Sequence, residues 1–189
     1  MGAVVAVGSV VAGCTGGGDP GPSPTVEEPV VTSPSETPEP TPTETGPAKP
    51  ERPAAMERDD VEGAAAAAEY FLELYPYVMA TGDTVEWDAM TWTETCTFCT
   101  SVSQDAATVQ DQAETFTGAQ ISVSNPDVGA FDDFLGGYPI IFDFEQTPHR
   151  RVAQDGTVVS EDDGDAGRLQ IDVLNREGAW LVLAVGDAE

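Results

Sequence analysis

Basic residues are scarce in this chain. The 189 residues include 7 Lys and Arg against 34 Asp and Glu, which gives a formal net charge of −27. The excess is not confined to one end, because residues 61–189 contain 24 acidic residues and four arginines. Nucleic acids and anionic membrane surfaces repel a chain of this charge. We therefore expect no nucleic-acid partner and no membrane binding through surface charge.

Histidine and cysteine are also scarce, with one His and three Cys in the chain. A structural zinc site takes four sulfur or imidazole ligands. If Cys14 is used elsewhere, only Cys96, Cys99 and His149 remain, and the set is incomplete. We predict no metal, no cofactor and no catalytic residue, and we interpret His149 as a lone surface histidine without a nucleophile spaced to use it.

The chain begins with a short apolar run, residues 3–12, which is too short to cross a bilayer as a helix and has the length of a signal-peptide core. The run ends in Val-Ala-Gly-Cys at residues 11–14, which resembles the lipobox of bacterial lipoproteins. The resemblance implies a signal peptide over residues 1–13 and a diacylglycerol on Cys14. Two acyl chains bind a membrane stably, so the predicted location is the extracytoplasmic face of the bacterial cell membrane.

Residues 14–57 have the composition of a spacer. Eleven of the fifteen prolines lie between residues 20 and 53, and no aromatic residue occurs there. Such a segment buries too little surface to offset its ordering entropy, so we expect a disordered, partly polyproline II tether rich in Pro, Thr and Glu. Residues 58–189 are then long enough for one domain with its own core.

The domain begins with a helical pattern. Asp59 is placed to cap a helix, with Glu62 completing a capping box, and Gly82 is placed to end it in the left-handed conformation. Phe71, Leu74 and Val78 predict its buried face, and Pro76 is expected to kink it. A second helix is predicted over residues 95–116, closed by Gly118, from the apolar spacing of Phe98, Val102, Ala106, Val109 and Ala113.

The period then changes to the alternation of strands. Apolar residues alternate with polar ones around residues 121–123, 138–144 and 169–173, and Asn-Arg-Glu-Gly at 175–178 predicts a hairpin turn before a strand at 180–185. Helices followed by antiparallel strands predict an α+β domain, with the N-terminal helices packed on one face of the sheet.

Three stretches carry a resemblance to a known family. These are residues 77–83, which contain Thr-Gly-Asp, the Cys-Thr-Phe-Cys of residues 96–99, and residues 148–159 with an Asp-Gly turn. Together they resemble an uncharacterised actinobacterial lipoprotein family, whose members also carry a lipobox and a Pro/Thr-rich spacer. The order of elements is similar to the cone-shaped nuclear-transport-factor-2-like fold, which implies a curved antiparallel sheet around a long helix. The family implies no activity.

Cys96 and Cys99 allow three interpretations: a structural disulfide, a redox centre or half of a metal site. Outside the cytoplasm thiols tend to be oxidised, whereas a helix start favours a reactive thiolate. A thioredoxin-like centre is expected near a βαβ pattern, and here a helix and an antiparallel meander surround the motif. We therefore favour the disulfide and predict that it shapes the opening of the concave side.

A pocket is predicted around the first interhelical loop. Its candidate residues are Tyr77, Asp83, Trp87, Asp88 and Trp92, although both acids also fit as turn or cap residues. The acidic stretch of residues 161–165 has the oxygen ligands of a weak calcium site, but a solvated turn is the favoured interpretation.

The resulting hypothesis is a lipid-anchored extracytoplasmic protein whose domain binds a small ligand or an envelope protein without catalysing a reaction. Two alternatives remain open. An enzyme using the cone pocket requires a titratable group deep in that pocket, and a thiol–disulfide protein requires an exposed Cys96–Cys99 bond. A binding module instead requires an apolar cavity or an exposed apolar patch.

Overall fold

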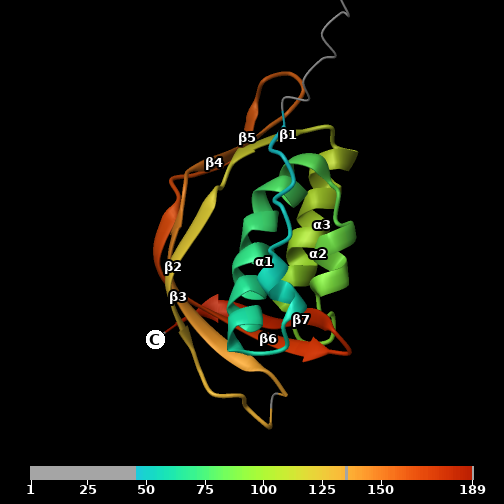
Figure 1. The fold of residues 1–189 in the computed structure, drawn as a ribbon. Helices are drawn as coiled ribbons and strands as arrows, with labels where there is room; N and C mark the ends of the chain where they lie inside the picture. Colours follow the sequence, from blue (N-terminus) through green and yellow to red (C-terminus); the bar gives the residue numbers. More distant parts are fainter. Residues whose placement is uncertain (1–45, 135, 189) are drawn as a thin grey trace, which may run out of the picture. The chain divides into compact units, whose positions relative to one another are not determined.

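The computed structural model describes residues 46–134 and 136–188, so the predicted signal peptide, Cys14 and most of the spacer lie outside the described residues. In these described ranges, three α-helices and a 3-10 turn precede seven strands (Figure 1). Their bounds are η1 Ala54–Glu57, α1 Val61–Thr81, α2 Val85–Met90, α3 Thr97–Asp111, β1 Thr115–Gly118, β2 Ile121–Val128, β3 Tyr138–Gln146, β4 His149–Val152, β5 Val158–Asp162, β6 Asp165–Arg176 and β7 Ala179–Asp187. The predicted α+β class, with helices packed on antiparallel strands, is confirmed.

The strands form two antiparallel sheets. One has the order β2-β3-β6-β7 and the other the order β1-β4-β5. The helices lie on one side of the curved strand layer, with α1 next to the sheet (Figure 1). Ala64, Ala67 and Ala68 have no exposed surface. Because their side chains are small, the helix backbone packs close to the sheet.

Helix α1 has the predicted end at Gly82, which adopts φ 71° and donates its N–H to Val78 O. The predicted cap is one residue off, because Asp60 and not Asp59 accepts hydrogen bonds from the backbone N–H groups of Glu62 and Gly63. The helix continues through Pro76 to Thr81. Phe71, Leu74 and Val78 are fully buried, as their spacing predicts.

The predicted second helix is too long. Helix α3 ends at Asp111, and Phe116 belongs to β1. Ala113 adopts φ 50°, Ala113 N–H bonds Gln110 O, and Glu114 N–H bonds Val109 O. This is the hydrogen-bond pattern of a Schellman motif, which normally places glycine at the left-handed position. Alanine is a strong helix former, so Ala113 does not predict the end of a helix. The short helix α2 is a separate difference, since the sequence does not predict it.

Residues 46–57, which the sequence assigns to the spacer, lie on the domain, and we name them the N-terminal strap. Glu86 of α2 holds the strap: Lys49 Nζ lies 2.7 Å from Glu86 Oε2 and Arg52 Nη1 lies 3.2 Å from Oε1. Met56 is 2% exposed, and its carbonyl accepts a 3.0 Å hydrogen bond from Trp180 Nε1. Burial by itself raises the pKa of the Glu86 carboxyl. Hydrogen bonds from Lys49, Tyr70 and Arg52 together have the larger effect, so the pKa lies below its ordinary value.

Candidate functional site

Two of the predicted pocket residues contact each other. The Tyr77 hydroxyl donates a 2.7 Å hydrogen bond to Asp83 Oδ2. This bond raises the pKa of the Tyr77 hydroxyl and lowers that of the Asp83 carboxyl. Asp83 Oδ1 also accepts a hydrogen bond from Val85 N–H at the start of α2. The pair therefore stabilises the connection between α1 and α2, in agreement with the cap interpretation of Asp83.

The other predicted pocket residues lie elsewhere. Trp87 is fully buried, and its ring stacks on Phe71 with centroids 3.9 Å apart. Trp92 lies under the guanidinium of Arg176, which is 5.4 Å from its ring centroid. Asp88 accepts hydrogen bonds from the hydroxyls of Thr84 and Ser103. The predicted pocket is therefore wrong, because Trp87 belongs to the core and Trp92 to a separate surface contact.

The Cys96–Cys99 disulfide is present, as predicted. It begins helix α3, where Cys96 Sγ accepts a hydrogen bond from Cys99 N–H. The two residues are 1% and 0% exposed, and Cys99 O accepts a 3.0 Å hydrogen bond from Trp87 Nε1. Thiol–disulfide exchange needs access to a sulfur, which this burial denies. The prediction that the bond shapes an opening is wrong, because the bond lies in the core.

Replacing both Cys96 and Cys99 with serine is expected to lower the free energy of unfolding by about 2 kcal/mol, because the bond closes a very short loop. The midpoint of urea unfolding measures this effect. An unchanged midpoint would show that the bond contributes nothing to stability.

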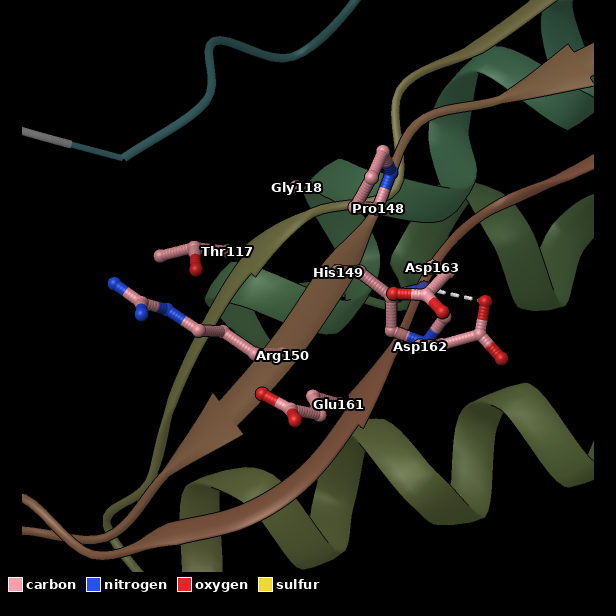
Figure 2. Close-up of a pocket in the computed structure, with 8 residues that line it drawn as sticks. All are labelled: Thr117, Gly118, Pro148, His149, Arg150, Glu161, Asp162 and Asp163. Carbon is pink, nitrogen blue, oxygen red and sulfur yellow. Dashed lines mark ion pairs between the residues drawn. The ribbon is translucent and has the colours of Figure 1, made fainter.

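A surface notch of about 320 Å³ lies where β1, β4 and β5 run side by side (Figure 2). Its lining residues are Thr117, Gly118, Pro148, His149, Arg150, Glu161, Asp162 and Asp163. The strand register pairs His149 with Asp162 and Arg150 with Glu161. Successive side chains of a strand point to opposite faces. His149 and Asp162 therefore share one face, and Arg150 and Glu161 share the other.

His149 is half-buried and not the lone surface residue that the sequence indicates. Its ring lies 5.5 Å from that of Phe116, and its Nδ1 is 4.0 Å from Asp162 Oδ1, beyond hydrogen-bond distance. Burial raises the pKa of the nearby Tyr75 hydroxyl, and the charges of Asp105 and Asp162 raise it further. The face of the sheet that carries His149 also carries Asp162 and, by the alternation of strand side chains, Arg151.

The notch offers charge rather than a nucleophile. The Thr117 hydroxyl lies on the face of Arg150, opposite to that of His149, by the strand register. Three carboxylates, from Glu161, Asp162 and Asp163, line the notch with one guanidinium. An ammonium or guanidinium group is the complementary ligand. Within residues 46–134 and 136–188, no cluster of His, Cys, Asp or Glu is suited to hold a metal ion.

Strand β5 forms one side of this notch. This strand is not among those predicted from the sequence, although the Asp155-Gly156 turn, flanked by Arg150–Val152 and two valines, is a hairpin signal. All five residues of β5 are exposed, and among the described strands β5 lies at the end of its sheet, paired with β4. The interpretation of the acidic stretch 161–165 as a turn holds only for Asp163 and Gly164, because Glu161 and Asp162 belong to β5 and Asp165 begins β6.

The comparison with protein families gives a match over residues 40–185 to a family of unknown function, DUF6318. The chain belongs to this family. No curated protein sequence matches it. None of the described helices of this DUF6318 protein meets the length and hydropathy that a membrane span requires.

Solved structures similar to the DUF6318 protein are distant. The intermembrane-space region of the chloroplast protein ARC6 has 8% identity and a TM-score of 0.46, covering 68% of this chain and 96% of that one. A Caulobacter vibrioides protein with a cystatin-like fold has 12% identity and a TM-score of 0.41, covering 65% and 87%. The benzoate 1,2-dioxygenase beta subunit from Burkholderia mallei has 8% identity and a TM-score of 0.38, covering 68% and 89%. None of them assigns a function to this chain.

An exposed apolar feature lies in the β2–β3 connection of the DUF6318 domain. Phe131 is 50% exposed and Phe134 is 96% exposed. The Phe131 ring packs edge-on against Tyr138, with centroids 5.3 Å apart. Phe134 N–H donates a 2.8 Å hydrogen bond to Asp132 Oδ1, which fixes the turn. The binding hypothesis expects such an apolar feature on an acidic surface.

Proposed function

We propose that this protein is a lipoprotein of the bacterial cell envelope whose domain binds a partner protein without catalysing a reaction. The lipid anchor is assigned to Cys14 because residues 11–14 resemble a lipobox and a Pro-rich stretch follows. The single observation that supports the binding role is the outer edge of β5 beside the acidic notch, with which no described strand pairs. Exposed strand edges are sites where another polypeptide adds main-chain hydrogen bonds.

The anchor is tested by the Cys14→Ser variant. In the native host, wild-type protein fed with an alkyne fatty acid is expected to carry the label and to sediment with membranes. The variant is expected to lose both properties, because the acylated sulfur is absent. The Cys96→Ser/Cys99→Ser variant is the matched control and is expected to stay labelled. A Cys14→Ser protein that keeps its label would overturn the assignment.

The binding role is tested by a photo-crosslinking amino acid at Ser160 of β5, in living host cells. A discrete adduct with another envelope protein is expected at Ser160. The same probe at Ala107, on the exposed side of α3, is the control and is expected to give no adduct. Equal adducts at both positions, or none at Ser160, would contradict the proposed role.

A further inference from the structure

The four sheet edges of the domain differ in how they are protected. The β7 edge is covered by the segment before α3: Trp92 N–H bonds Val182 O at 3.0 Å, and the Thr95 hydroxyl bonds Leu183 O at 2.7 Å. The β2 edge contains Pro126, and its register shifts between Ser124 and Asp127. Proline and bulges both prevent a further strand from pairing.

The β1 edge is enclosed by other parts of the fold. A hollow at this edge is lined by Pro47 of the strap, Pro76 and Ala80 of α1, and Thr115 and Phe116 of β1. A strand approaching β1 therefore meets the strap and α1. Of the sheet edges in the described residues, β5 is the one for which the hydrogen bonds and hollows of the domain identify no cover.

The β5 edge is held in one conformation by its hairpin turn. Ala153 N–H bonds Thr157 O at 2.8 Å, and Gly156 N–H bonds Ala153 O at 2.9 Å. Thr157 N–H bonds Asp155 Oδ1 at 2.9 Å. A strand that is already extended loses little conformational entropy when a partner pairs with it. The edge is therefore preorganised for strand addition.

The side chains along β5 set the chemistry of a partner. Val158 and Val159 at its start are each 48% exposed. Glu161 and Asp162 at its end, with Asp163 after it, line the acidic notch. A complementary strand therefore has apolar side chains opposite the valines and a basic side chain at the notch.

We propose that β5 accepts an extended segment of a partner protein as an added strand, and that a Lys or Arg of this segment enters the acidic notch. This inference rests on the proposed binding role and specifies the partner's chemistry. Charge argues against a second copy of the chain as the occupant, since both copies carry 24 acidic residues against four arginines from residue 61 onward. The favoured occupant has two adjacent apolar residues opposite Val158 and Val159 and two adjacent basic residues opposite Glu161 and Asp162, because neighbouring side chains of β5 point to opposite faces.

The test uses the full chain labelled with ¹⁵N and the peptide acetyl-Lys-Lys-Thr-Val-Val-Thr-amide, whose order complements the Val-Val-Ser-Glu-Asp of β5 in an antiparallel pairing. Amide shifts are expected foremost in Val158–Asp162. A peptide methylated at every backbone nitrogen keeps its charges but donates no backbone hydrogen bond, and it is expected to bind about tenfold more weakly. The same peptide with Glu for Lys is expected not to bind.

Paired variants distinguish binding of the peptide by the notch carboxylates from its general attraction to the negative charge of the domain. The Glu161→Gln/Asp162→Asn protein is expected to bind the lysine peptide about tenfold more weakly. The Asp127→Asn/Asp133→Asn protein has the same charge change, with Asp127 at the end of β2 and Asp133 in the β2–β3 connection, and is expected to bind as the wild type does.

Three outcomes would overturn strand addition at β5: no peptide binding, equal binding of the methylated peptide, or shifts centred on the connection that holds Phe134. The crosslinking at Ser160 decides the proposed function independently. A discrete adduct there, together with no peptide binding, would leave the binding role intact and reject strand addition.

Discussion

The Trp87→Ala variant is expected to lose about 4 kcal/mol of unfolding free energy, because a fully buried indole is removed and a cavity remains. The ring of Trp87 stacks on Phe71 and lies 6.2 Å from that of Phe98, and its Nε1 donates to Cys99 O. The substitution thus removes the contact that joins α1, α2 and the disulfide. Chemical denaturation monitored by circular dichroism measures the loss.

Two further variants distinguish packing from the hydrogen bond of Trp87. Trp87→Phe keeps an aromatic stack but removes the Nε1 hydrogen bond to Cys99 O, a carbonyl that still accepts from the Ser103 hydroxyl, and a loss of about 1 kcal/mol is expected. Trp92→Ala removes a tryptophan from the contact with Arg176, and a loss of about 1 kcal/mol or less is expected. Equal losses in Trp87→Ala and Trp92→Ala would contradict the core assignment of Trp87.

The Glu114→Ala variant is expected to lose about 3 kcal/mol, because it leaves a largely buried guanidinium without a counter-charge. The Glu114 side chain is 2% exposed and that of Arg151 is 20% exposed. Arg151 Nη2 lies 2.7 Å from Glu114 Oε2, and Arg151 Nε donates to the same oxygen at 2.8 Å. The pair connects the turn after α3 to the middle strand of the three-stranded sheet.

The control for Glu114→Ala is Glu145→Ala, which removes an exposed carboxylate from β3 and is expected to change stability by less than about 0.5 kcal/mol. The double variant Glu114→Met/Arg151→Met is expected to be more stable than Glu114→Ala, since neither charge stays buried. A double variant less stable than Glu114→Ala would show that the pair acts through more than its charges.

Local signals in the sequence were sufficient for much of the fold. Helix α1 follows from its apolar spacing and from Gly82, and the β6–β7 hairpin follows from the Asn-Arg-Glu-Gly turn. These signals depend on neighbours within a few residues. The end of α3 could not be predicted, because Ala113 adopts the left-handed conformation and Glu114 is stabilised there by Arg151, 37 residues away.

The candidate site was less accessible to sequence analysis than the fold. The Cys96–Cys99 bond was predictable because both cysteines lie in one short motif. Trp87 was assigned to a pocket because a sequence does not indicate which aromatic residues face the core. The notch depends on the register that places His149 opposite Asp162, and the open edge depends on the position of β5 in its sheet.

The N-terminal strap also determines how the domain responds to tension. A force that pulls on the chain from its N-terminal side reaches the contacts of Glu86 with Lys49 and Arg52 first. It reaches the burial of Met56 next, and helix α1 last. The ion pairs at Glu86 are partly exposed and are individually weak. We therefore expect tension applied from the N-terminal side to detach residues 46–57 from the domain before the helices and sheets unfold.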